Sequence, residues 1–172
     1  VGTPVEKPRL MQLGYCCINL TLRAQRPPVY TGRSISRRLF TLQKASALAA
    51  ANTEDLGAIL EWNLRRRIFV FRITSDLFPR MTDPRAAYRI GDLPDARAIK
   101  RNLREAGKFA RRHAMRLSFH LGPFALFGSP RPASRAAGLA EIEAHAAIAE
   151  HTCEGGDLDI PVNTHVGGSY GG

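Results

Sequence analysis

The stretch Arg116-Leu117-Ser118-Phe119-His120-Leu121-Gly122 predicts a buried β-strand that ends in a histidine and leads into a glycine loop. Asn163-Thr164-His165-Val166-Gly167-Gly168 shows the same pattern near residue 165. In sheets of parallel strands, functional side chains gather where the strands end. We therefore expect His120 and His165 to lie at one edge of an α/β sheet and to form a metal site there.

Two further apolar runs, residues 13–20 and residues 68–73, also predict strands. The spacing of apolar residues predicts helices over residues 36–51, 95–112 and 134–151. Another helix is expected from Asn52 or Thr53, as its N-cap, to the arginines at 65–67, with Glu54 and Asp55 in its first turn. The element order is therefore β-αα-β-α-β-α-β.

Strands that alternate with helices indicate parallel pairing through right-handed crossovers. Four such strands fit a small doubly wound sheet or about half of a (β/α)8 barrel. A complete barrel typically takes about 250 residues, and this chain has 172. Asn19, Asp76, His120 and His165 would lie at the four strand ends.

The chain carries 25 Lys and Arg against 15 Asp and Glu, a formal net charge of +10. Such a surplus favours a polyanionic partner, of which nucleic acid is the commonest, and a solvated basic surface is the alternative. The three cysteines, Cys16, Cys17 and Cys153, offer no disulfide framework and indicate a reducing, cytoplasmic setting. No apolar run reaches the roughly 18 residues of a membrane span, so we expect no membrane partner.

Four ordered segments of the chain resemble the UV damage endonuclease family. They are residues 14–22 (Gly-Tyr-Cys-Cys-Ile-Asn-Leu-Thr-Leu), residues 60–63 with 71–79, residues 116–120 followed by Ser129-Pro130-Arg131, and residues 163–171. The resemblance implies a (β/α)8 TIM barrel of which residues 1–172 form the N-terminal half, about the first four βα units. It also implies metal-dependent hydrolysis of the phosphodiester bond 5′ of UV photoproducts in damaged double-stranded DNA, in excision repair.

The resemblance assigns site residues one at a time. His120 and His165 match the family's strand-end metal ligands, and manganese is the expected ion, with zinc and magnesium as alternatives. Tyr15, Asn19 and Phe124 match residues that contact the DNA. Taken alone, Tyr15 suits a core tyrosine and Asn19 a turn former. For Asp76, a helix cap or an ion pair with Arg80 is expected ahead of metal binding.

The chain departs from the family after His120, where the family usually has His-Pro-Gly-Gln and an aromatic residue. Here the sequence is His120-Leu121-Gly122-Pro123-Phe124, so Phe124 keeps the aromatic side chain and Pro123 cannot supply the hydrogen bonds of Gln. The carboxylates that bridge the family's metals come from later strands. We therefore expect a truncated chain that is inactive as a monomer and that self-associates through exposed strand edges.

Two other functions fit the residues. One is a non-catalytic, basic DNA-binding remnant, for which the logarithm of the affinity would fall linearly with the logarithm of the salt concentration. The other is a half-barrel, metal-dependent protein similar to sugar isomerases, in which Tyr15 and Phe124 would have no role in DNA binding.

Overall fold

The computed structural model describes residues 11–123, 125–154, 156 and 158–165 and contains one parallel four-stranded sheet. Its strands are β1 (Gly14–Cys16), β2 (Val70–Ile73), β3 (Arg116–His120) and β4 (Val162–Asn163), in the spatial order β1-β2-β3-β4. A doubly wound sheet reverses its strand order at a switch point, whereas a (β/α)8 barrel adds strands in sequence. The expected parallel α/β fold is confirmed, and its strand order is that of a partial barrel.

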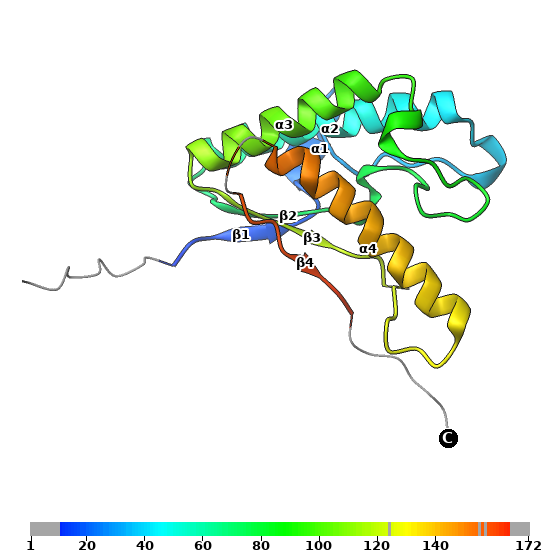
Figure 1. The fold of residues 1–172 in the computed structure, drawn as a ribbon. Helices are drawn as coiled ribbons and strands as arrows, with labels where there is room; N and C mark the ends of the chain where they lie inside the picture. Colours follow the sequence, from blue (N-terminus) through cyan, green and yellow to red (C-terminus); the bar gives the residue numbers. More distant parts are fainter. Residues whose placement is uncertain (1–10, 124, 155, 157, 166–172) are drawn as a thin grey trace, which may run out of the picture.

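The strands are connected by the long helices α2 (Leu42–Arg65), α3 (Ala96–Arg112) and α4 (Pro132–Cys153). A short helix, α1 (Leu20–Arg23), follows β1, and the loops contain the 3₁₀ turns η1 (Arg37–Leu39), η2 (Ser75–Leu77) and η3 (Ile90–Asp92). Helix α3 packs against both α2 and α4, and Figure 1 shows α2 and α3 together on one side of the sheet.

The two faces of the sheet differ in chemistry because side chains alternate along each strand. Phe71, Ile73, Leu117 and Phe119 face the helices and are fully buried. The opposite side, which we call the open face, carries Cys16 from β1, Val70 and Arg72 from β2, Arg116, Ser118 and His120 from β3, and Asn163 from β4. These residues are half-buried or exposed.

The first strand is shorter than the sequence predicts. It ends at Cys16, and Cys17 has a φ of 59°, in the left-handed region, which turns the backbone out of the sheet. Asn19 then caps α1, its side-chain oxygen accepting a hydrogen bond from the Leu22 N–H at 3.0 Å. The expected strand over residues 13–20 is therefore wrong beyond Cys16, and Asn19 is a helix cap after a strand.

The prediction of two helices between residues 36 and 67 is also wrong, because α2 is continuous from Leu42 to Arg65. Asn52 and Thr53 lie inside it and are 0% and 1% exposed. The Thr53 hydroxyl donates to the Ala49 carbonyl oxygen at 2.9 Å, within the helix. The helix begins instead at Thr41, whose hydroxyl accepts a hydrogen bond from the Lys44 N–H at 3.2 Å.

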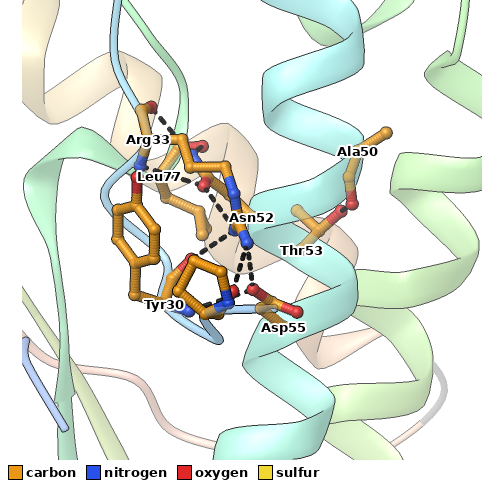
Figure 2. A network of polar contacts seen from close by, with 8 residues as sticks. Tyr30, Arg33, Ala50, Asn52, Thr53, Asp55 and Leu77 are labelled. Atoms are coloured by element: carbon orange, nitrogen blue, oxygen red, sulfur yellow. Dashed lines mark hydrogen bonds and ion pairs between the residues drawn. The ribbon is translucent and has the colours of Figure 1, made fainter. Parts of the chain in front are cut away.

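A buried polar network attaches the loop before α2 to that helix (Figure 2). Arg33 forms an ion pair with Asp55 at 2.6 Å and stacks on the Tyr30 ring with 4.5 Å to the ring centroid. Asn52 accepts a hydrogen bond from the Arg33 N–H and donates to the Leu77 carbonyl oxygen, both at 3.1 Å. The network therefore joins two loops at the end of the sheet where the strands finish.

Across the described residues, none of the helices has the length and hydropathy that a membrane crossing requires.

Candidate metal and DNA-contact site

His120 and His165 come together at the carboxyl edge of the sheet. His120 is the last residue of β3, and the backbone of His165 forms a parallel bridge with Leu126 just beyond β4. Their Nε2 atoms lie 2.9 Å apart, and their ring centroids are 4.6 Å apart. Two residues separated by 45 positions therefore converge as their places at successive strand ends predict.

The geometry of this pair fits two ligands of one transition metal ion. Metal–nitrogen bonds of about 2.0–2.1 Å place two imidazole nitrogens of one tetrahedral site about 3.3 Å apart. The observed spacing of 2.9 Å lies slightly below that value. Without a metal, one ring must donate its Nε2 proton and the other must accept it.

Within the described part of the chain, no group of three or more His, Cys, Asp and Glu side chains is arranged to hold a metal ion. The His120 Nδ1 is buried and has no hydrogen-bond partner there. Metal-ligating histidines usually donate this second ring N–H to an acceptor. The two histidines therefore supply part of a metal site, and a complete site needs further ligands.

The charge state of His120 suits a ligand. Burial lowers the pKa of His120, and the nearby charges of Arg72 and His165 lower it further. A lowered pKa favours the neutral imidazole near pH 7, and only the neutral ring has a free lone pair on Nε2.

Tyr15 and Asn19 lie near the end of β1, on the side that faces the helices. The Tyr15 ring contacts Phe71 edge-on at 5.1 Å, and its hydroxyl donates to the Asn63 side-chain oxygen at 2.7 Å. The Asn19 amide donates to the same hydroxyl at 2.9 Å. Burial raises the pKa of Tyr15, against the opposing effect of these two hydrogen bonds. Both side chains are therefore engaged within the protein, and a role in DNA contact stays a prediction.

Other expected site residues behave differently. Phe124 lies outside the described residues, as does the glycine segment after His165. Asp76 is exposed within η2 and does not cap that turn, which Thr74 caps instead. Arg80 forms its ion pair with Asp83 at 3.3 Å, so the expected pair with Asp76 is wrong.

Arg72, which the structure places on the open face beside His120, is not among the site residues predicted from the sequence. The signal was available, because Arg72 is the one charged residue in the apolar strand Ile68-Phe69-Val70-Phe71-Arg72-Ile73. The register with β3 was needed to connect it to the histidines.

Comparison with known proteins gives a consistent result. The family described as UV-endonuclease UvdE matches residues 11–172. The UV DNA damage endonuclease of Clostridium perfringens is 28% identical over 161 residues, which are 94% of this chain and 36% of that protein. The UV-damage endonuclease of Schizosaccharomyces pombe is 28% identical over 168 residues, 94% of this chain and 27% of that protein.

A solved structure also matches. The crystal structure of SacUVDE superposes with a TM-score of 0.79 at 23% identity and covers 93% of this chain and 50% of that one. At this identity the likeness shows the fold. The chain thus spans about half the length of that structure and about a third of the two curated relatives.

Proposed function

The chain belongs to the UV-endonuclease UvdE family, and from this premise we propose that it forms part of an enzyme that hydrolyses a phosphodiester bond in UV-damaged double-stranded DNA. The bond cut would be the one 5′ of the photoproduct. The observation that carries the proposal is the convergence of His120 and His165 at the carboxyl edge of a barrel-type sheet. Active sites of such folds lie at this edge.

In this proposal His120 and His165 hold a divalent metal, with manganese first and zinc or magnesium as alternatives. A bound metal of this kind activates water near neutral pH and offsets negative charge on the phosphate. The contribution of His120 is a neutral ring, because burial and the Arg72 charge oppose its protonation. Binding is expected to weaken as the pH falls, since protonation removes the lone pair.

The net charge of +10 supports binding to the DNA backbone. We assign Tyr15, Asn19 and Phe124 to the region near the lesion, with Tyr15 held by Asn19 and Asn63 rather than free to move. The three free cysteines fit a reducing compartment, and the cytoplasm is the proposed location.

Manganese binding to the purified protein tests the metal site, with free Mn²⁺ followed by electron paramagnetic resonance. His120→Ala and His165→Ala should each weaken binding at least about tenfold, because each removes one nitrogen ligand. His113→Ala is the matched control, since His113 ends α3 and its ring lies tilted against that of Phe109, with 4.5 Å between the ring centroids. Equal Mn²⁺ binding by the His120→Ala variant and the unsubstituted protein would refute the site.

Incision by the complete enzyme that contains this chain is measured separately, with supercoiled plasmid that is either irradiated with ultraviolet light or left untreated. For the complete enzyme of which this chain forms part, the proposal predicts nicking of the irradiated plasmid that requires Mn²⁺ and is lost in both histidine variants. Nicking that persists in the presence of EDTA, or that is equal on both plasmids, would contradict it.

A further inference from the structure

Arg72 is a cationic side chain on the open face, next to the paired histidines. The sheet register pairs it with Cys16 on β1 and with Ser118 on β3. His120 stands two residues after Ser118, so Arg72 and His120 lie on the same face as diagonal neighbours across two adjacent strands. Both side chains therefore lie on the open face, near the carboxyl ends of the strands.

The guanidinium of Arg72 has no oxygen partner among the described residues. Its Nε is buried without a hydrogen-bond partner, although the side chain as a whole is half-buried. Nor does any described carboxylate form an ion pair with it, and this includes Asp76, which follows β2. By contrast, the part-buried Arg33 is paired with Asp55 at 2.6 Å. A buried guanidinium N–H without an acceptor costs free energy, and no described carboxylate offsets the charge of Arg72, so this position favours an incoming anion.

The surroundings of Arg72 restrict what that anion is. Burial raises the pKa of the neighbouring Cys17 thiol, and the charge of Arg72 together with a hydrogen bond between Arg72 and Cys17 opposes that rise. The neutral thiol does not neutralise a guanidinium, and neither does an imidazole, which carries no negative charge. Arginine presents N–H donors in a planar fork that matches two oxygens of a phosphate. A phosphodiester lying against the paired histidines would therefore complete the hydrogen bonds of this side chain.

We propose that Arg72 binds the non-bridging oxygens of the phosphate that is cut, beside His120 and His165. The inference rests on the proposed endonuclease function and adds a residue to its site. In hydrolysis the oxygen of water bonds to phosphorus, the bond from phosphorus to the leaving sugar oxygen breaks, and that oxygen takes up a proton. Arg72 stays protonated throughout and stabilises the charge on the phosphate oxygens in the transition state.

A structural role is the competing explanation, in which Arg72 pairs with a carboxylate of the protein. The two roles differ in their effect on stability. Removing an arginine that has no protein partner should leave the melting temperature within about 2 °C or raise it, whereas breaking a buried ion pair should lower it by several degrees.

The test compares Arg72→Gln with Arg116→Gln in the protein. Arg116 is a matched control because it lies on the same face, at the start of β3, and pairs with Val70 at the other end of the sheet. The probe is a duplex that carries one photoproduct, and its affinity is measured between low and moderate salt. Arg72→Gln should weaken binding about tenfold and reduce the salt slope by about one, as for one lost phosphate contact. Arg116→Gln should change neither quantity.

Incision by the complete enzyme that contains this chain supplies a second readout. Arg72→Gln should lower kcat about 100-fold with a smaller change in KM, because the contact strengthens in the transition state. Arg72→Lys should recover affinity but not kcat, since it keeps the charge and loses the planar fork. Added guanidinium should partly restore the Arg72→Gln variant.

Each contrary result is decisive. Unchanged affinity and salt slope in Arg72→Gln, an equal loss in Arg116→Gln, or a drop of several degrees in the melting temperature of Arg72→Gln would overturn the inference. If the complete enzyme that contains this chain does not cut irradiated DNA at all, the proposed function fails, while the binding comparison still decides whether Arg72 contacts phosphate.

Discussion

Replacing Asn52 with Ala should destabilise the protein by about 2–3 kcal/mol. Asn52 is fully buried in the middle of α2 and makes three good hydrogen bonds to the backbone of two loops (Figure 2). It accepts from the Arg33 N–H and donates to the Arg33 and Leu77 carbonyl oxygens, each at 3.1 Å. Alanine makes none of these bonds and leaves buried backbone groups of both loops without a partner.

The magnitude follows from those three bonds. Each contributes about 1 kcal/mol net, and a buried group left unpaired costs about 1–3 kcal/mol. Alanine returns about 0.5 kcal/mol because it is the better helix former. For a chain of this size the net loss corresponds to a decrease in melting temperature of about 5–10 °C.

Urea denaturation followed by circular dichroism measures the change in the free energy of unfolding. Glu54→Ala is the matched control, because Glu54 is exposed on the same helix, and its effect should stay within about 0.5 kcal/mol. An Asn52→Ala variant that unfolds within 0.5 kcal/mol of the unsubstituted protein, roughly the effect of a surface substitution, would refute the reasoning. It would mean that water replaces the lost hydrogen bonds.

Two further predictions concern helix packing and pH. Gly107→Ala on α3 should destabilise by about 1–3 kcal/mol, because an added Cβ would collide with the backbone oxygen of Thr152 on α4. Gly57→Ala on α2 should instead stabilise the protein by about 0.8–1 kcal/mol, since a Cβ there meets no atom within 4 Å. Thermal denaturation of both variants tests the two predictions, and equal melting temperatures would contradict them. Stability in EDTA should be highest above the ordinary histidine pKa of about 6.5 and fall as the pH drops through the lower folded-state pKa of His120. His120→Gln should flatten this dependence in denaturation curves at a series of pH values, and an unchanged slope would exclude His120 as its source.

The overall fold was predictable because each strand and helix has its own apolar pattern, which extends over many consecutive residues. Apolar runs of four to six residues and helices of more than three turns identify their type without knowledge of any partner. The strand at β2 and the helix at α3 match the expected ranges to within two residues at each end. Parallel pairing then follows from the alternation of strands and helices, whereas the choice of a barrel over a doubly wound sheet came from the family resemblance.

The errors lie where a polar residue has two possible partners. Asn52 and Thr53 have the chemistry of an N-cap, and the acidic residues after them strengthen that interpretation. The alternative partners of Asn52 are the backbone groups of Arg33 and Leu77, which lie 19 and 25 positions away. A sequence pattern within one helix cannot reveal such contacts, because they depend on how the two loops pack.

The convergence of the histidines was predictable because both follow strands that end at the same edge of the sheet. Which side chains lie beside them depends on the alternation of residues along each strand. His120 lies an even number of positions from Ser118, which is paired with Arg72, so all three share the open face. Phe71 and Phe119 occupy the alternate positions and fill the core. Tyr15 is in register with Phe71 and not with Arg72, so it turns toward Asn63 on α2.

A shift of one residue in the pairing of β2 with β3 would bury Arg72 among the helices and expose Phe71. The same apolar positions that stabilise the sheet therefore fix which side chains face the histidine pair, and a substitution at Arg72 should change binding while leaving the core intact.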